Sequence, residues 1–346
     1  MAETRRHGSE ALPPFAIRLA AWWQRAGRHD LPWQAPPGDS YRIWISEIML
    51  QQTQVATVIP YYEKWLSRFP NLASLASAPL DEVLALWSGL GYYARARNLH
   101  RAALLCLSRH GGRLPDDPAL LQTLPGIGRS TANAIISLAH DRVLPILDGN
   151  ARRVLARHAA IGGWPGQKRV ADRLWRAASQ RLPASGGAVH TQAMMDLGSL
   201  LCTACRPACG TCPVGADCRA RQTASVDELP ASRPARPRPR KRCWLLVRRD
   251  PDGRILLERR PPHGIWGGLW SLPETEQDPG GTPLAPIDHA FTHFTLRLEP
   301  RLIGDATALP LADREQRWWA PDQALALGLP KPIRHLVTVL ERVESG

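Results

Sequence analysis

The chain has 346 residues, of which 44% are hydrophobic and 22% are charged. This composition excludes wholesale disorder, and the length predicts about two domains because single cores stop growing before this size. No apolar run approaches the ~18 residues of a membrane span, and no apolar segment typical of a secretory signal follows the N-terminus. We therefore expect a cytoplasmic protein with no membrane partner.

The net charge of +13 is distributed unevenly along the chain. Residues 1–220 carry 25 Lys and Arg against 15 Asp and Glu, a net +10, whereas residues 221–242 carry +5 and residues 243–346 carry −2. A basic first part beside a slightly acidic second part indicates a polyanionic partner, most simply nucleic acid. A second interpretation stays open, because an arginine-rich genome and a need for solubility produce the same excess.

Residues 1–220 are predicted to be helical almost throughout. Apolar residues recur at helical spacing in seven runs, namely Phe15–Trp23, Ile43–Met49, Val83–Trp87, Leu99–Leu107, Ala132–Leu138, Val154–Ala160 and Met194–Leu201. Prolines at positions 60, 70, 79, 115, 118, 125 and 145 are expected to separate the helices. We predict about ten short helices and no strand in this part.

Residues 221–242 are predicted to form a linker, because the alternating Pro and Arg residues near their end disfavour both a helix and a central strand. After the linker the pattern changes to short β-like runs and one amphipathic terminal helix. The expected strands are Cys243–Arg248, Arg254–Glu258, Phe291–Leu298 and Gln316–Trp319, and the helix is Lys331–Val343. Residues 243–346 are therefore predicted to be an α+β module.

Five of the seven cysteines lie between residues 202 and 218. Cys202, Cys209, Cys212 and Cys218 have the spacing C-x6-C-x2-C-x5-C, and Cys205 is an additional thiol. In a cytoplasmic chain such clustering favours a metal site over disulfides. Four thiolates suit either zinc or an iron–sulfur cluster, and the spacing, which differs from that of common zinc modules, favours iron–sulfur.

The segment Leu124-Pro-Gly-Ile-Gly128 is predicted to be the turn of a helical hairpin between Pro118–Leu124 and Thr131–His140. Gly126 and Gly128 permit a turn whose backbone N–H groups face outward at the start of the second helix. That geometry binds a phosphate without reading a base. A plain helical hairpin without a ligand has the same pattern.

Two carboxylates stand out from their surroundings. Asp148 precedes the predicted helix Ala151–Ala160, where an N-cap is the commonest role of an aspartate. Glu47 lies within a strongly apolar helix, so burial is expected to raise its pKa and to suit it to general-acid catalysis. The alternative is that Glu47 lies on the polar face of that helix with Gln51 one turn later.

Taken together, several motifs resemble the adenine DNA glycosylases of the MutY type. These motifs are Ser46-Glu-Ile-Met-Leu-Gln-Gln-Thr-Gln54, Gly89-Leu-Gly-Tyr-Tyr-Ala-Arg-Ala-Arg-Asn98, Leu124–Gly128, Ile146-Leu-Asp-Gly-Asn150, Gln192-Ala-Met-Met-Asp-Leu-Gly198 and the four-cysteine segment. The resemblance implies an all-α helix–hairpin–helix glycosylase domain over residues 1–220, with a 4Fe–4S loop at 202–218 held by the four cysteines. It further implies a Nudix-like domain over residues 243–346.

The resemblance also implies an activity. The enzyme would flip adenine out of double-stranded DNA where it is mispaired with 8-oxoguanine or guanine and cleave its glycosidic bond, acting as a monomer. Glu47 would protonate the adenine ring, and Asp148 would stay ionised and stabilise the sugar cation. Ser130 stands where related bifunctional glycosylases have a lysine that forms a Schiff base, so a monofunctional enzyme is expected.

Further residues acquire expected DNA contacts from the same resemblance. Gln51 and Gln52 would fill the gap in the base stack, Tyr92 would wedge beside the oxidised guanine, Leu31 and Trp33 would line the adenine pocket, and Gly126 and Gly128 would hold the backbone. In the C-terminal module, Phe291, Thr292 and His293 would contact 8-oxoguanine. The Glu-rich box of Nudix hydrolases is missing, so no pyrophosphatase activity is expected.

One further departure from the family pattern and two competing functions need mention. The segment Glu274–Ile287 is short and rich in Pro and Gly, so a helix expected there is predicted to be absent. A related glycosylase acting on mispaired thymine or oxidised pyrimidine would leave the C-terminal module without a role. A catalytically inert DNA-binding or redox-sensing protein would lack one of the carboxylates, yet Glu47 and Asp148 are both present.

Overall fold

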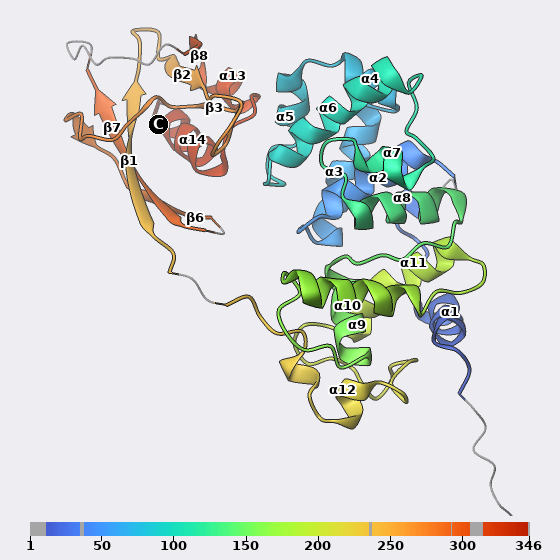
Figure 1. The fold of residues 1–346 in the computed structure, drawn as a ribbon. Helices are drawn as coiled ribbons and strands as arrows, with labels where there is room; N and C mark the ends of the chain where they lie inside the picture. The colour runs from blue at the N-terminus through green and yellow to red at the C-terminus, as the bar shows by residue number, and fades with distance from the viewer. Residues whose placement is uncertain (1–11, 35–37, 235–236, 292, 305–313, 345–346) are drawn as a thin grey trace, which may run out of the picture. The chain divides into compact units, whose positions relative to one another are not determined.

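The computed structural model describes residues 12–34, 38–234, 237–291, 293–304 and 314–344. It divides into two compact units, which are described separately: one contains residues 1–48 and 114–234, and the other contains residues 49–113 and 235–346. The helical region is therefore shared between both units (Figure 1). The chain leaves the first unit near the end of α2 (Ser40–Leu50) and returns to it at Leu114.

The first unit is helical. Its elements besides α2 are α1 (Phe15–Ala26), the 3-10 turn η1 (Pro32–Gln34), α7 (Pro118–Gln122), α8 (Arg129–His140), α9 (Gly149–His158), α10 (Lys168–Ser179), α11 (Gly187–Asp196), the π-helical turn η2 (Leu197–Leu201), α12 (Arg219–Gln222) and the 3-10 turn η3 (Val226–Glu228). Its core includes the fully buried side chains of Leu19, Leu155, Leu174 and Leu197. These side chains join α1, α9, α10 and η2 in one core. Burying each of them stabilises the fold by roughly 1.5–3 kcal/mol.

The second unit begins with four helices and continues into the C-terminal module. The helices are α3 (Val55–Arg68), α4 (Leu72–Ser77), α5 (Leu80–Leu86) and α6 (Ala94–Arg109). The strands are β1 (Arg240–Arg248), β2 (Ile255–Arg259), β3 (Trp270–Ser271), β4 (Glu274–Thr275), β5 (Thr282–Pro283), β6 (Ile287–Ala290), β7 (Thr295–Ile303) and β8 (Gln316–Trp319), and two helices, α13 (Pro321–Leu325) and α14 (Lys331–Glu344), follow.

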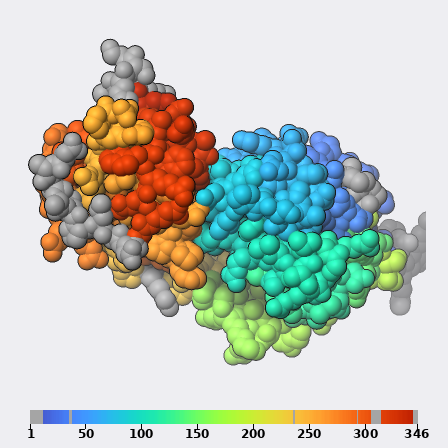
Figure 2. All heavy atoms as spheres, turned by 90° about the horizontal axis from the view of Figure 1, so that it is seen from above, coloured from blue at the N-terminus to red at the C-terminus, as the bar shows by residue number. Residues whose placement is uncertain are grey.

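The strands form two sheets. The larger sheet has the order β4-β1-β7-β5, with β6 also paired to β7, and the smaller sheet has the order β3-β2-β8. β1 and β7 run parallel with Arg240 opposite Thr295 and Arg248 opposite Ile303. One face of α14 packs into the core through Leu336, Val337 and Leu340, while Val339 is exposed. Figure 2 shows that part of the C-terminal region, coloured red, lies at the surface.

Three details of the sequence prediction need correction. Pro60 does not separate two helices but lies inside α3, where it leaves the carbonyl of Ala56 without its helical N–H partner. β1 starts at Arg240, inside the predicted linker, because no proline follows Pro239. The strand predicted over Phe291–Leu298 is wrong in its first half, since Phe291 belongs to the turn between β6 and β7.

Two cysteines lie outside the cysteine segment: Cys106 is fully buried, and Cys243 packs against the core of the C-terminal module. One other expectation is confirmed. The described residues between Glu274 and Ile287 form short strands and loops and no helix. Among the residues that the structure describes, no helix is long and apolar enough to cross a bilayer.

Candidate active site

Glu47 lies on α2 among the buried side chains of Ile43, Trp44 and Ile48, and part of its own surface stays accessible. Burial and, to a smaller extent, the charge of Asp148 raise the pKa of Glu47 to about 8. A carboxyl group with this pKa carries its proton at neutral pH. Of the two interpretations of Glu47, the desolvated carboxyl therefore holds, and a solvated residue on a polar face does not.

Asp148 is the N-cap of α9. Its Oδ1 accepts a 2.8 Å hydrogen bond from the backbone N–H of Ala151, and its Oδ2 accepts one of 3.1 Å from that of Asn150. The positive end of the helix and these two donors favour a negative charge at this position. The two hydrogen bonds of the N-cap hold the Asp148 carboxylate in place, and its charge acts on Glu47. Capping α9 and influencing the acid are therefore two roles of the same side chain.

Ser130 lies in the first turn of α8. Its Oγ accepts a 2.9 Å hydrogen bond from the backbone N–H of Leu147, the residue before Asp148. The side chain thus tethers the segment that carries the carboxylate to the helix after the hairpin. The position holds a hydroxyl group and no amine, so it offers no group for Schiff-base chemistry.

Close packing of η2 against the start of α9 explains why the motif Gln192–Gly198 ends in glycine. A Cβ atom on Gly198 would lie 2.5 Å from the Cβ of Asn150, so only glycine lets η2 approach the start of α9 this closely. Arg153 bridges the two segments, since its Nη2 donates to Asn150 Oδ1 at 2.8 Å and to the carbonyl of Gly198, while its Nε donates to the carbonyl of Cys202 at 2.6 Å. This bridge connects the helix capped by Asp148 with the cysteine segment.

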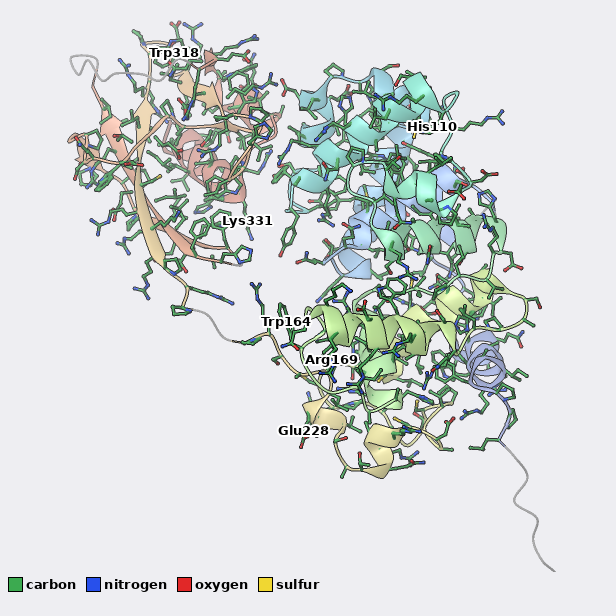
Figure 3. The ribbon with its side chains drawn as sticks, in the orientation of Figure 1. His110, Trp164, Arg169, Glu228, Trp318 and Lys331 are labelled. Atoms are coloured by element: carbon green, nitrogen blue, oxygen red, sulfur yellow. The ribbon has the colours of Figure 1, made fainter. Side chains whose placement is uncertain are left out.

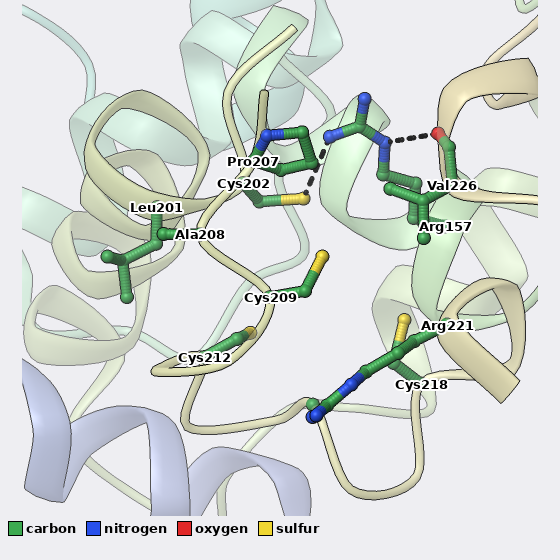
Figure 4. A pocket seen from close by; sticks show the side chains of 11 residues that line it. Arg157, Leu201, Cys202, Pro207, Ala208, Cys209, Cys212, Cys218, Arg221 and Val226 are labelled. Atoms are coloured by element: carbon green, nitrogen blue, oxygen red, sulfur yellow. Dashed lines mark hydrogen bonds between the residues drawn. The ribbon is translucent and has the colours of Figure 1, made fainter. Parts of the chain in front are cut away.

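The thiols of Cys202, Cys209, Cys212 and Cys218 line one cavity of about 30 Å³ (Figure 4). All four are free cysteines. Burial and the neighbouring thiols raise the pKa of Cys212 to about 11. In the described residues, no group of three or more His, Cys, Asp or Glu side chains is arranged to hold a single metal ion. The donor set, four soft sulfur atoms around one enclosed space, nevertheless fits an iron–sulfur cluster in its chemistry.

Arg157 is a residue that the sequence analysis missed. This buried side chain of α9 donates from Nη1 to the Sγ of Cys202 at 3.4 Å (Figure 4) and to the carbonyl of Thr203 at 2.6 Å. Its Nε donates to the carbonyls of Val226 and Leu229 at 3.0 and 2.9 Å. One guanidinium therefore joins the start of the cysteine segment to the turn around η3 that follows it, and places a positive charge beside a thiol. Arg157 lies within a helix and outside the motifs quoted above, so the sequence offered no sign of this role.

Leu31 and Trp33, the residues expected in an adenine pocket, are buried around η1. Gln34 holds this turn, because its Oε1 accepts from the N–H of Leu31 at 3.1 Å and its Nε2 donates to the carbonyl of Arg28 at 2.8 Å. The guanidinium of Arg28 pairs in turn with the fully buried Asp196. The aspartate of the motif Gln192–Gly198 thereby anchors the segment that carries Leu31 and Trp33.

The predicted hairpin is present between α7 and α8. Asp117 caps α7 at its start, and Gly128 is the N-cap of α8. Gly126 has a φ of 82°, which a residue with a side chain rarely adopts, and both glycines are exposed. Leu124 and Ile127 are buried and anchor the turn. The exposed backbone at the start of a helix suits a phosphate group.

In the second unit, Arg95 organises the two turns that carry Gln51, Gln52 and Tyr92. Its Nη1 donates to the carbonyls of Met49 and Gln51 at 2.8 and 2.6 Å, and its Nη2 donates to those of Leu90 and Gly91 at 3.1 and 3.2 Å. Burial lowers the pKa of Arg95 to about 10, so it stays charged at neutral pH.

Both turns have a strained backbone. Gln52 and Tyr92 have φ values of 60° and 48°, which are uncommon for residues with side chains. Gln52 is exposed, and half of the Tyr92 surface is exposed. Strain of this kind persists where surrounding contacts enforce it, and the bonds from Arg95 are such contacts. The sequence identified Gln52 and Tyr92 but not the residue that holds them.

The turn between β6 and β7 carries the residues expected to contact 8-oxoguanine. The N–H of Phe291 donates to the carbonyl of Phe294 at 2.8 Å, and the two rings stack at 4.6 Å. The rings of Trp266 and His289 also pack against the ring of Phe291, with centroid distances of 5.3 and 4.6 Å. His293 is exposed, and Thr292 lies outside the described residues.

Within the second unit, the C-terminal module contacts the helices α5 and α6 and the turn between them. The hydroxyl of Tyr93 donates to the carbonyl of Leu329 at 2.9 Å, and Arg97 Nη1 donates to the carbonyl of Gly267 at 2.6 Å. Asp81 forms an ion pair with Arg259. The turn bearing Tyr92 and the C-terminal module are thus joined directly.

Comparison with protein families identifies two domains. Residues 45–180 match the HhH-GPD superfamily of base excision DNA repair proteins, and residues 243–339 match the NUDIX domain. The adenine DNA glycosylase of Buchnera aphidicola (subspecies Acyrthosiphon pisum) is 33% identical over 93% of this chain and 96% of its own length. The enzymes of that name from Rattus norvegicus and Homo sapiens are 38% and 36% identical over 77% of this chain, covering 61% and 58% of theirs.

Solved structures show the same helical fold. A thermostable thymine-DNA glycosylase has a TM-score of 0.55 and 25% identity, covering 60% of this chain and 95% of its own. A non-covalent complex of endonuclease III with DNA has a TM-score of 0.51 and 21% identity, covering 60% of this chain and 94% of its own. The expected helix–hairpin–helix glycosylase fold, followed by a Nudix module, is confirmed.

Proposed function

Because this chain belongs to the adenine DNA glycosylases, we propose that it removes adenine mispaired with 8-oxoguanine, and less efficiently adenine opposite guanine, as a monofunctional enzyme. The chain is a DNA glycosylase of base excision repair. The observation that carries the finer proposal is the pair formed by Glu47, whose pKa is raised to about 8, and the capped carboxylate of Asp148.

The pair supplies an acid and an anion at the same pH. Glu47 donates its proton to a ring nitrogen of the flipped adenine, and the bond between that base and the sugar then breaks with the electron pair leaving on adenine. Asp148 stabilises the positive charge that develops on the sugar, and water adds to the sugar carbon while losing a proton to solvent. The products are free adenine and an abasic site.

We assign strand positioning to the surrounding residues. Gly126 and Gly128 bind a backbone phosphate, Leu31 and Trp33 line the base pocket, and Gln51, Gln52 and Tyr92 occupy the stack around the mispair. Phe291, Thr292 and His293 contact the oxidised base. The ring cluster behind Phe291 and the bonds from Arg95 support these assignments, because both hold their turns in one conformation.

Cys202, Cys209, Cys212 and Cys218 would hold a 4Fe–4S cluster. Bound there, the cluster would cross-link the segment 202–218 through iron–thiolate bonds and order a loop next to the helix capped by Asp148. Arg153 and Arg157 support this role, since both donate hydrogen bonds to Cys202. We propose that the enzyme acts as a monomer on double-stranded DNA.

One assay tests the proposed function. Purified protein is incubated with duplexes that contain one adenine opposite 8-oxoguanine, guanine or thymine, and alkali then cleaves any abasic site. We expect cleavage opposite 8-oxoguanine, slower cleavage opposite guanine and none opposite thymine. A duplex with thymine opposite guanine tests the competing thymine glycosylase. Cleavage of that duplex alone would overturn the proposal.

A further inference from the structure

α10 carries a row of arginines that the motifs discussed so far do not use. Arg173 and Arg176 are exposed, and neither side chain has a hydrogen-bond or ion-pair partner among the described residues. The opposite face of the helix is buried through Val170, Leu174 and Ala177. Figure 3 shows Arg169 near the start of the same helix. A charged face on an amphipathic helix is common, so the surroundings of these arginines decide whether they have a role.

The arginines face a hollow in the first unit. It has a volume of about 510 Å³, and its lining includes titratable residues from three separate segments, namely His158, Arg173, Arg176, Arg181, Asp217 and Arg219. Arg219 is exposed and, like Arg173 and Arg176, lacks a side-chain partner in the described part of the chain. Side chains from α10 and from the start of α12 thus converge on one concave surface.

The negative charge in this hollow is already paired. Asp217 Oδ2 lies 2.7 Å from Arg18 Nη2, and its Oδ1 lies 3.3 Å from His158 Nε2. Arg181 donates from Nη2 and Nε to His158 Nδ1 at 3.0 and 3.2 Å, so two of the lining groups satisfy each other. The remaining guanidinium groups of Arg173, Arg176 and Arg219 therefore present uncompensated positive charge to solvent.

A second hollow of about 430 Å³ continues along the same helix and shares Arg176 and Gln180 with the first. Its lining includes Arg129, whose guanidinium stacks at 4.0 Å over the ring of Trp175. Arg129 directly follows Gly128 of the hairpin. Asp172 also lines the second hollow, and its carboxylate is paired with Lys168 at 3.0 Å. We call the arginines that line the two hollows, Arg129, Arg173, Arg176 and Arg219, the arginine groove.

We propose that the arginine groove binds backbone phosphates of duplex DNA beyond the phosphate held by the hairpin, and so extends the DNA contact along α10. Unpaired guanidinium groups on a concave surface match phosphodiesters, which they contact without regard to base sequence. The proposal rests on the DNA-binding role assigned to the hairpin. The groove adds affinity for any duplex and does not distinguish the mispair.

The test uses the full-length protein with two of the groove arginines removed, Arg173→Ala/Arg176→Ala. Binding of an undamaged duplex of 30 base pairs is measured by fluorescence anisotropy over a range of sodium chloride concentrations. Each lost phosphate contact lowers the slope of log affinity against log salt by about 0.9, so we expect a slope reduced by about 2 and affinity reduced roughly tenfold. Far-UV circular dichroism verifies that the variant is folded.

A matched control removes the same charge elsewhere, in Arg25→Ala/Arg101→Ala, since these exposed arginines line neither hollow. An unchanged slope in the groove variant, or an equal reduction in the control, would overturn the proposal. Sodium phosphate replaces chloride at equal ionic strength in a third series. If the groove variant loses only the response to phosphate, the groove binds a free anion and the proposal is wrong. Adenine excision by the wild type tests the proposed function independently.

Discussion

Together with burial, which contributes most, the charge of Asp148 raises the pKa of Glu47, although the two residues lie on helices from distant parts of the chain. A negative charge at the N-cap of α9 makes it harder for Glu47 to lose its proton. A protonated carboxyl group together with a carboxylate held by two backbone N–H donors is the arrangement that acid-assisted cleavage with a stabilised cation requires.

Glu47→Gln is expected to lower the single-turnover rate of adenine excision by about 10²–10⁴-fold, because an amide cannot supply the proton. The wild-type rate is expected to fall above pH 8, where Glu47 loses its proton. Rates are measured on the duplex with adenine opposite 8-oxoguanine from pH 5 to pH 9. Full activity in the variant would exclude Glu47 as the acid.

Glu47→Gln is also expected to increase the stability of the folded protein at neutral pH. The pKa of Glu47 is raised from 4.5 to about 8 on folding, so the contribution of this group to stability is complete below pH 4.5 and is lost as the pH rises toward 8. Gln does not titrate, so at pH 7 the free energy of unfolding of the variant is expected to exceed that of the wild type by at most about 3 kcal/mol. Urea unfolding at pH 4.5 and pH 7 measures the difference. An advantage of equal size at both pH values would contradict the raised pKa.

The wild-type enzyme is expected to form no covalent adduct with DNA in the presence of borohydride, because Ser130 offers no amine. Ser130→Ala removes the acceptor for the N–H of Leu147 and is expected to cost about 1 kcal/mol of stability. Denaturant unfolding and gel analysis of trapped complexes measure these outcomes. A strong adduct with wild-type protein would show that another residue acts as the nucleophile.

Arg95→Lys is expected to destabilise the turns that carry Gln52 and Tyr92, since one ammonium cannot replace a guanidinium that bonds four carbonyl groups. Breaking a buried network of this kind costs about 2–4 kcal/mol. Thermal unfolding measures the loss, and Arg101→Ala on the exposed face of the same helix is the control, with an expected change within about 0.5 kcal/mol. Equal stability of Arg95→Lys and wild type would remove Arg95 from this role.

Arg157→Met is expected to reduce the iron and sulfide content of the purified protein, because Cys202 and the carbonyls of the cysteine segment lose their common donor. Cys209→Ser is expected to reduce it further. Cys205→Ser, which changes an exposed thiol outside the set of four, should retain both elements. Chemical analysis of iron and acid-labile sulfide decides the outcome. Equal loss in Cys205→Ser would mean that the assigned ligand set is wrong.

Local patterns were sufficient to predict several features of the candidate site. The hairpin follows from its glycines, because Gly126 needs a positive φ, and the cap at Asp148 follows from an aspartate before a helix. The strand predicted over Phe291–Leu298 failed at its start, because alternation of apolar residues does not reveal a turn closed by a bond between Phe291 and Phe294. The prediction that Pro60 separates two helices was also wrong, because the packing of α3 outweighs the loss of one helical hydrogen bond.

By itself, the sequence determined the residue types that chemistry demands: two carboxyl groups, four clustered thiols, a glycine hairpin and a serine in place of a lysine. Only the tertiary structure decided that Glu47 keeps its proton, that Arg95 and Arg157 hold the segments carrying the predicted residues, and that arginines of α10 and α12 line one groove. The reason is physical. Desolvation, charge coupling and the reach of a guanidinium depend on distances between segments that are remote in sequence, and no local pattern encodes those distances.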